Sequence, residues 1–398
     1  MKTLFKVTVL SALTLAVFVG CDEKKEEETP EGVTKIQGNV FRPALVPATE
    51  ENVSQLRVPA GFKVSKFAEG LVNPRMMAVS EAGDVYVTNR AAGTVTLLRD
   101  ADGDGKSDES QVVASKEQMH GITIHNNTVY LVTVKEVFAA DIQTDGSLGA
   151  LQLLIGDLPD GGQHPNRTIA FGPDDRMYLT VGSTCNACKE SSQESATILR
   201  VNAESSARTV FAEGLRNTIG FGWHPQTGEL WGMDHGIDWL GDEEQPEELN
   251  QLVEGKNYGW PYIHGEGKFY TPIELPKDST FERFRQRSAN PTLVYQAHSA
   301  PLGMVFYTGS QFPVEYQNHA FITMRGSWNR REPSGYKVVR LHFENGKPTR
   351  FEDFLTGFLV KNNQEQFARL AGIALHRDGS LLVADDTNGV IYRVFYQP

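Results

Sequence analysis

The chain has 398 residues, with 38 Lys and Arg against 50 Asp and Glu, which gives a formal net charge of −12. With 40% hydrophobic and 22% charged residues, it has the composition of a folded globular protein, and this excludes a disordered chain. The acidic balance argues against nucleic acid as a partner, because phosphate binding needs a concentrated basic surface. The 37 glycines and 21 phenylalanines favour many short strands joined by turns over a helical bundle.

Residues 1–21 are typical of a processed export signal. Two lysines precede an apolar run over residues 7–20, which is shorter than the roughly 20 residues that span a bilayer. The run ends in residues 18–21 (FVGC), which resemble the lipobox of bacterial lipoproteins, so we expect Cys21 to be lipidated. Simple secretion and an uncleaved anchor are the alternatives.

Residues 22–50 are predicted to form a disordered tether, because residues 22–28 are all charged and cannot bury apolar surface. The functional domain is then residues 51–398. We expect it to work in the cell envelope, on the periplasmic side, held near the membrane by the N-terminal lipid.

One unit recurs along this domain: a short alternating strand, a turn with Gly or Asp, and a second alternating strand. The copies occupy residues 77–88, 121–133, 168–180, 219–233, 303–324 and 372–384. Several are followed by a third strand, at residues 93–98, 198–202, 336–343 and 389–395. Period-2 alternation across a tight turn is the hairpin signal, and six extended hairpins predict an all-β fold, a six-bladed β-propeller. The alternative is an irregular β-sandwich.

The spacing between the fourth and fifth hairpins is longer than the others. The excess lies at about residues 240–300, which are rich in Pro, Trp, Tyr and charge. Such an insertion is expected to pack over one end of the propeller and to shape the site there.

The acidic loop of residues 100–108 places Asp100, Asp102 and Asp104 at alternate positions around glycines. This spacing is typical of Ca²⁺-binding loops, in which hard carboxylate oxygens converge on a hard cation. A solvated acidic turn between two blades is the alternative.

Cys185 and Cys188 have C-x-x-C spacing. In an exported protein this favours a local disulfide that closes a loop, with a redox dithiol or a metal-ligand pair as alternatives.

The longest informative stretch contains residues 214–220 (GLRNTIG), 234–236 (DHG) and 255–261 (GKNYGWP). Taken with residues 161–164 (GGQH) and 326–330 (GSWNR), it resembles the soluble quinoprotein sugar dehydrogenases, in particular their L-sorbosone or pyranose dehydrogenase-like branch. The resemblance covers about residues 55–395. It implies a six-bladed propeller that holds pyrroloquinoline quinone (PQQ) and Ca²⁺ and oxidises a sugar, a sugar aldehyde or a related alcohol.

The resemblance also implies residue roles. His164 matches the general base that removes the hydroxyl proton of the substrate. Arg216, with Asn217 beside it, matches the arginine next to the quinone oxygens, and Lys337 and Arg369 match residues that hold the PQQ carboxylates.

Three further positions complete the implied site. Gly236 and Ile237 fall where backbone carbonyls hold the active-site Ca²⁺. Trp328 is expected to offer an aromatic face to cofactor or sugar. Electrons are expected to pass to a quinone or a cytochrome.

The sequence departs from the glucose-oxidising members at three places. Ser183 stands where those members carry the Asp that orients the base, Ala371 replaces a second arginine, and Ile237 replaces a proline. These changes leave PQQ binding in place but count against glucose as the substrate.

Two other function classes remain open. One is a lactonase-like propeller hydrolase with Ca²⁺ on Asn73, Asn217 and Asp385. The other is a propeller that binds protein or glycan without catalysis.

Overall fold

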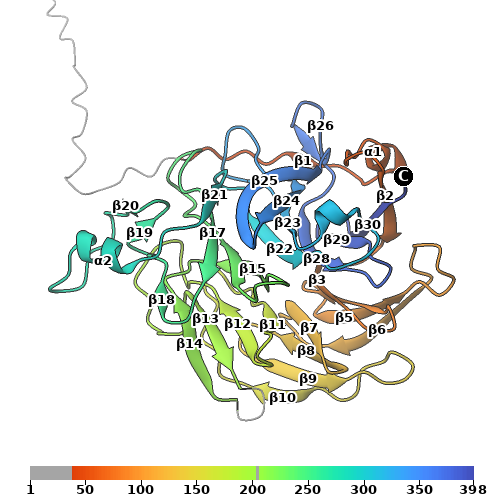
Figure 1. Ribbon diagram of the computed structural model, residues 1–398, viewed down its shortest axis with the longest axis horizontal. Helices are drawn as coiled ribbons and strands as arrows, with labels where there is room; N and C mark the ends of the chain where they lie inside the picture. The colour runs from red at the N-terminus through yellow and green to blue at the C-terminus, as the bar shows by residue number, and fades with distance from the viewer. Residues whose placement is uncertain (1–37, 203–205) are drawn as a thin grey trace, which may run out of the picture.

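The computed structural model describes residues 38–202 and 206–398. The predicted signal peptide, its Cys21 and most of the predicted tether lie outside these residues. Within the described residues, six antiparallel sheets surround a central axis, with one innermost strand from each sheet beside that axis (Figure 1). The protein is therefore a six-bladed β-propeller, all six predicted hairpins are confirmed, and the alternative of a sandwich is wrong.

The first three blades follow the chain from the axis outwards. Blade 1 consists of β3 (Pro74–Val79), β4 (Val85–Asn89), β5 (Thr94–Arg99) and β6 (Glu109–Ser115). Blade 2 consists of β7 (Gly121–His125), β8 (Thr128–Val132), β9 (Val137–Asp141) and β10 (Gln152–Ile155). Blade 3 consists of β11 (Ile169–Phe171), β12 (Met177–Val181), β13 (Thr197–Val201), β14 (Arg208–Glu213) and a parallel fifth strand, β18 (Lys256–Asn257).

The last three blades complete the ring. Blade 4 consists of β15 (Thr218–Trp223), β16 (Leu230–Asp234), β17 (Glu247–Leu252) and β21 (Leu293–Tyr295). Blade 5 consists of β22 (Pro301–Phe306), β23 (Ala320–Met324), β24 (Lys337–Glu344) and β25 (Lys347–Leu355), with the 3₁₀ turn η1 (Val314–Tyr316) between β22 and β23. Blade 6 consists of β28 (Leu370–Leu375), β29 (Leu381–Asp385), β30 (Val390–Tyr396) and β2 (Phe62–Ala68).

The second strand of most blades is buried along its whole length, as in β4, β12, β16, β23 and β29. Adjacent blades cover both faces of these strands, so their sequences are nearly continuous apolar runs. Trp231 and Trp260 are buried, and Trp223 packs against this core at its edge.

Strand β2 closes the ring, because the outermost strand of blade 6 comes from the start of the domain and pairs with the last strand of the chain, β30. The ring of Phe62 anchors β2. It makes edge-to-face contacts with Phe312, Tyr316, Phe354 and Tyr396 at centroid distances of 4.7, 5.0, 5.1 and 5.1 Å. The closure therefore combines a backbone ladder with an aromatic cluster.

The insertion at residues 240–300 differs from the prediction. Strands β17 and β21 within it belong to blade 4 itself. The hairpin β19 (Ile263–His264) and β20 (Lys268–Phe269), with helix α2 (Phe281–Arg287), forms a lobe at the outer edge of the disc (Figure 1). Only residues near the two ends of the insertion line the pocket described below, because its middle part forms the lobe at the outer edge of the disc.

Residues 38–50 are packed against the propeller, so the predicted tether over 22–50 is too long at its C-terminal end. Strand β1 (Ala44–Leu45) pairs in parallel with β27 (Glu365–Gln366), which also pairs with β26 (Leu359–Val360). Helix α1 (Glu50–Ser54) follows, and its first turn is capped by the Thr49 hydroxyl, which accepts a hydrogen bond from Asn52 N at 3.1 Å.

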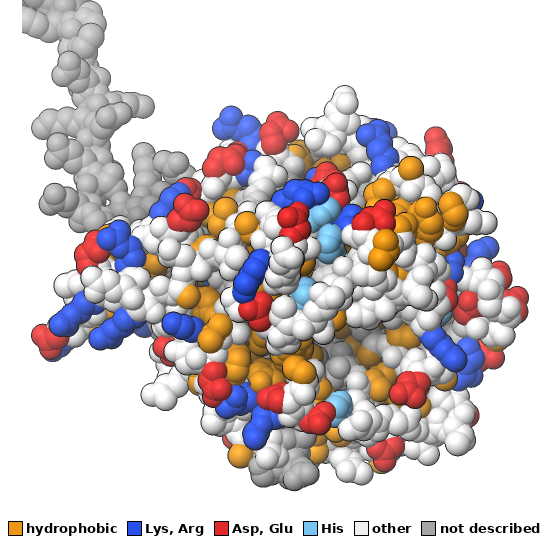
Figure 2. Space-filling model, in the orientation of Figure 1, with side chains coloured by type: hydrophobic (Ala, Val, Ile, Leu, Met, Phe, Trp, Pro, Cys, Tyr) orange, Lys and Arg blue, Asp and Glu red, His pale blue; other side chains and the backbone are white. Residues whose placement is uncertain are grey.

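The face shown in Figure 2 has interspersed acidic and basic side chains and a hollow near the middle of the disc. Among the described residues, the helices are too short and too polar to cross a membrane.

Candidate active site

The candidate site lies at the end of the axis where the innermost strands begin. In each antiparallel hairpin the start of the first strand lies beside the end of the second, as in the pairs Thr218–Asp234, Pro301–Met324 and Leu370–Asp385. Residues just before the first strand and just after the second therefore meet at one face. They surround a pocket of about 340 Å³.

The pocket wall comes from three blades. Blade 3 supplies Gln163, His164 and Asn166. Blade 4 supplies Arg216, Asn217, His235, Gly236, Asp238 and Glu247. Blade 5 and the loop before it supply His298, Ala300, Arg325, Trp328 and Asn329. A larger groove of about 610 Å³ lies between α1 and strands β2, β5 and β6, and it contains none of the predicted site residues.

His164 presents a basic nitrogen to this pocket. Its Nδ1 lies 2.8 Å from both the carbonyl and the hydroxyl oxygen of Ser183. The Ser183 hydroxyl donates its only hydrogen to Cys185 O at 2.7 Å, so Nδ1 must carry the hydrogen toward Ser183. The lone pair then lies on Nε2. Burial, followed by the charge of Arg216, lowers the pKa of His164 to about 3, so the imidazole is neutral near pH 7.

Arg216 and Asn217 are fixed at the start of β15 by a buried carboxylate. Asp234, at the end of β16, accepts hydrogen bonds from Arg216 N and Asn217 N, both at 2.8 Å, and from Thr218 Oγ1 at 2.9 Å. The guanidinium of Arg216 forms an ion pair with Asp238 at 3.2 Å. The Asn217 side chain keeps one acceptor unused, because its buried Oδ1 has no hydrogen-bond partner. An unmet buried acceptor at a pocket wall indicates a place for a ligand.

Gly236 and Ile237 form the turn after β16. Their N–H groups donate to Glu247 Oε2 at 3.0 Å and Gln245 Oε1 at 3.2 Å. Among the described residues, no donor meets their carbonyl oxygens. Glu247 lies behind this turn, and burial raises its pKa to about 8. Bare carbonyls beside a carboxyl group are ligands that suit Ca²⁺.

Arginines outnumber their carboxylate partners around the pocket. Arg75 and Arg325 share one buried carboxylate, Asp386, which Arg325 contacts at 2.9 and 3.1 Å. Within the described part of the chain, the guanidinium groups of Arg167 and Arg369 bond to backbone carbonyls and to no carboxylate. The excess positive charge would favour an anionic ligand.

Two of the four predicted cationic and basic residues do not line the pocket. Lys337 begins β24, the third strand of blade 5, and its ammonium binds both oxygens of Asp353 at 2.9 and 2.8 Å. Arg369 lies next to the pocket, but its guanidinium donates to the carbonyl oxygens of Arg325 and Gly326. The structure therefore does not bring Lys337 to the site, whereas Arg325 lines the pocket.

Trp328 does line the pocket, and the N-terminal segment holds it there. Its ring meets Trp239 edge-to-face at 5.0 Å, and the Arg42 guanidinium lies 5.3 Å above it. Phe41 N donates to Trp328 O at 3.2 Å. Residues just before β1 therefore support Trp328, which is one wall of the pocket.

The polar pocket residues that sequence reasoning did not assign include His235, Glu247, His298 and Arg325. His235 donates from Nδ1 to Asn217 O at 2.6 Å and leaves Nε2 for the pocket, and burial lowers its pKa to about 4. His235 lies within the motif at residues 234–236, and Arg325 directly precedes the motif at residues 326–330, so their positions carried a signal. Glu247 and His298 carried none, because only the tertiary fold brings them to the site.

Two other predicted groups lie away from this pocket. In the loop between β5 and β6, the carboxylates of Asp100, Asp102 and Asp108 converge, while Asp104 is not part of that group. Asp100 accepts hydrogen bonds from Gly103 N at 2.8 Å and Gly105 N at 2.9 Å. Such backbone hydrogen bonds to an Asp form both in acidic turns without a metal ion and in Ca²⁺-binding loops, so they are consistent with both alternatives.

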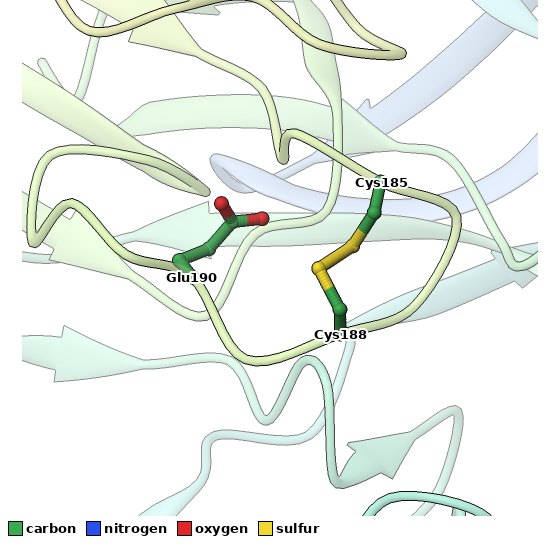
Figure 3. A group of neighbouring side chains, drawn as sticks. All are labelled: Cys185, Cys188 and Glu190. Carbon is green, nitrogen blue, oxygen red and sulfur yellow. A yellow bond between two sulfur atoms is a disulfide. The ribbon is translucent and has the colours of Figure 1, made fainter.

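Cys185 and Cys188 form a disulfide in the loop after β12, with Glu190 beside it (Figure 3). The two cysteines thus form the local disulfide that the sequence favoured over a redox dithiol or a metal-ligand pair.

The side-chain set of a lactonase-like Ca²⁺ site does not converge. Asn217 lines the pocket, but Asn73 donates to Asp386 O at 2.9 Å and Asp385 accepts from Arg369 N at 2.9 Å and Thr387 Oγ1 at 2.7 Å. Asp385, at the end of β29, accepts backbone and hydroxyl hydrogen bonds in blade 6 as Asp234, at the end of β16, does in blade 4.

Comparison with known proteins places this geometry in a family. Residues 56–397 match the TrAA12-like family model. An uncharacterized protein of Borreliella burgdorferi is 31% identical over 373 residues, which cover 88% of this chain and 93% of that protein. A pyrroloquinoline quinone-dependent sugar dehydrogenase of Hypocrea jecorina is 23% identical over 97% of this chain and 95% of its own length.

The calcium structure of a Trichoderma reesei AA12 enzyme superposes with a TM-score of 0.77 and 20% identity, covering 86% of this chain and 97% of that one. The fold is thus shared with that enzyme. The chain belongs to the TrAA12-like family of PQQ-dependent sugar dehydrogenases and AA12 pyranose dehydrogenase-like proteins.

Proposed function

We propose that the protein is a PQQ- and Ca²⁺-dependent dehydrogenase that oxidises a sugar, a sugar aldehyde or a related alcohol. The observation that carries the proposal is that a neutral imidazole, a buried guanidinium, an unmet amide oxygen and a bare carbonyl line one pocket: those of His164, Arg216, Asn217 and Gly236. The second bare carbonyl, of Ile237, belongs to the next residue of the same turn. The names of the relatives from Hypocrea and Trichoderma support the cofactor, the metal and the substrate class.

The residues present fit both groups. PQQ is a flat trianion, and the excess of arginines over carboxylates around the pocket would offset its charge. Arg325 and Arg216 stand at the pocket wall, and Arg325 shares its carboxylate, Asp386, with Arg75. The carbonyls of Gly236 and Ile237 would hold Ca²⁺. Bound PQQ would supply a quinone carbon that accepts hydride, and Ca²⁺ would act as a Lewis acid on its oxygens.

The protein's own contribution is proton transfer and charge placement. His164 Nε2 takes the hydroxyl proton of the substrate, and the Ser183 carbonyl keeps Nδ1 protonated as the imidazole becomes cationic. Arg216, held by Asp234 and Asp238, places a fixed positive charge beside the reacting centre. Trp328 offers its ring as one wall for the sugar.

We further propose that electrons leave to a quinone or a cytochrome, on the periplasmic side of the cell envelope. The support is the apolar run at residues 7–20 followed by Cys21, which would carry the lipid anchor. The non-catalytic propeller is the remaining alternative.

The proposal is tested by titrating the purified apoprotein with PQQ and Ca²⁺ in a calorimeter, followed by dye reduction with a panel of aldoses and alcohols. We expect saturable binding that EDTA abolishes, and dye reduction with at least one aldose. Arg325→Gln should weaken PQQ binding tenfold or more, because it removes a positive charge that would face the anionic cofactor. A tenfold change corresponds to about 1.4 kcal/mol of binding free energy.

Lys337→Gln is the matched control, because it removes a cation whose partner is Asp353 rather than the pocket. Its PQQ affinity should equal that of the wild type. No heat and no dye reduction with the wild-type protein would defeat the dehydrogenase reading and leave the binding propeller.

A further inference from the structure

One short loop contacts both residues on which the proposed chemistry depends. It follows β12, begins at Ser183 and contains the disulfide between Cys185 and Cys188 (Figure 3). A second contact, between Thr184 and Glu190, joins the two ends of the loop. Glu190 accepts hydrogen bonds from Thr184 N at 2.8 Å and from Thr184 Oγ1 at 2.6 Å. The loop is therefore tied to itself by one covalent bond and one carboxylate.

Asn186 lies between the two cysteines and binds the Arg216 side chain twice. Its carbonyl accepts from Arg216 Nε at 2.8 Å, and its Oδ1 accepts from Arg216 Nη2 at 2.7 Å. The same Oδ1 accepts from Asp238 N at 3.0 Å, next to the ion pair between Asp238 and Arg216. With its side chain only 3% exposed, Arg216 depends on these acceptors for its direction.

The other end of the loop determines the state of His164. The Ser183 oxygens receive the Nδ1 hydrogen, and the carbonyl of Cys185 receives the Ser183 hydroxyl hydrogen. Ser183 N also donates to Arg216 O at 2.8 Å, which joins the loop to the start of β15. A change in the backbone at Cys185 would thus reach both the imidazole and the guanidinium.

We propose that the disulfide-closed segment Cys185–Cys188 is the positioning element of the active site, with Asn186 as the positioning residue for Arg216. The consequence for catalysis rests on the proposed function. A ring closed across two intervening residues removes conformational freedom from the Asn186 peptide, so both of its acceptors stay aimed at the guanidinium.

The test uses two variants and a control from the same loop. Cys185→Ser with Cys188→Ser opens the ring, and Asn186→Ala keeps the ring but removes the side-chain acceptor. Lys189→Ala is the matched control, because Lys189 is exposed and adjoins the ring. The disulfide is removed by mutation to serine and not by adding a thiol reductant, because thiols add to ortho-quinones and would consume the PQQ.

The first measurement is hydrogen exchange in the apoprotein. Opening the ring should raise exchange at residues 183–188 and 214–218, with the other blades unchanged and with no change in the control. The second is steady-state kinetics with PQQ and Ca²⁺. Both variants should lose about ten- to a hundredfold in kcat, as is usual for partners of a reacting group, while KM for the sugar changes less than threefold.

Wild-type exchange and wild-type kcat in both variants would overturn the inference and leave the proposed function standing. An equal loss of kcat and rise of KM, together with exchange raised throughout the molecule, would also overturn it, because the loop would then serve general stability. If the wild-type protein binds no PQQ, the proposed function fails, and hydrogen exchange alone decides whether the loop positions Arg216.

Discussion

His164 keeps its lone pair on Nε2 because a single serine uses both of its oxygens as acceptors and spends its hydroxyl hydrogen elsewhere. The backbone carbonyl of Ser183 thus orients the imidazole. His164→Gln should lower kcat by about 10²- to 10⁴-fold, the usual share of a general base, with PQQ affinity unchanged. Stopped-flow reduction of bound PQQ by the sugar measures this loss.

Ser183→Ala is the companion variant. It keeps the carbonyl that receives the Nδ1 hydrogen, so its loss of kcat should stay below about tenfold. A Ser183→Ala variant as impaired as His164→Gln would mean that the hydroxyl, not the carbonyl, orients the base. Because the pKa of His164 is about 3, its own protonation should not reduce activity between pH 7 and pH 5.

Among the elements, β2 closes the ring, since it joins the start and the end of the domain in one blade. The side chain of Phe62 fills the space between β2 and blade 5, with four aromatic neighbours. Phe62→Ala should cost about 3–5 kcal/mol of the free energy of unfolding, the usual range for a fully packed aromatic residue. Urea denaturation followed by tryptophan fluorescence measures the change.

Lys63→Ala is the control for this element, because Lys63 lies on the same strand and is exposed, with its ammonium on Gln397 Oε1 at 3.0 Å. Its free energy of unfolding should stay within about 0.5 kcal/mol of the wild type. A similarly small cost for Phe62→Ala would show that the ladder to β30 closes the ring without the aromatic cluster.

For the molecule as a whole, buried acids set the response to alkaline pH. Burial raises the pKa of Glu247 to about 8 and that of Glu248 to about 7, above the 4.5 of an unburied glutamate. The folded protein therefore holds protons near neutral pH that the unfolded chain has released. This contribution is complete below pH 4.5 and is lost as the pH rises through 7 to 8, at up to about 1.4 kcal/mol per pH unit for each proton.

Buried histidines act in the opposite direction at lower pH. The pKa of His164 is about 3 and those of His235, His264 and His319 are about 4. Their contribution to the free energy of unfolding is therefore complete above about pH 6.5, the ordinary histidine pKa, and is lost only as the pH falls below that value. Stability should therefore fall between pH 7 and pH 9, and Glu248→Gln should make that fall shallower. Thermal melts of the apoprotein in EDTA measure both slopes. Glu254→Gln, which removes an exposed partner of Arg200, should leave the slope unchanged.

The hairpins and the number of blades followed from the sequence, because period-2 alternation is a local property of the chain. The resemblance carried by contiguous motifs singled out His164, Arg216 and Asn217, which the structure places at one pocket. Only the tertiary structure decided which side chains face the axis. Lys337 begins a third strand and pairs with Asp353, whereas Arg325, at the end of a second strand, reaches the pocket. Glu247 and His298 arrive from an insertion that mostly lies outside the ring. The placements of Lys337, Glu247 and His298 depend on strand order and on contacts between residues far apart in the chain, and no local pattern encodes them.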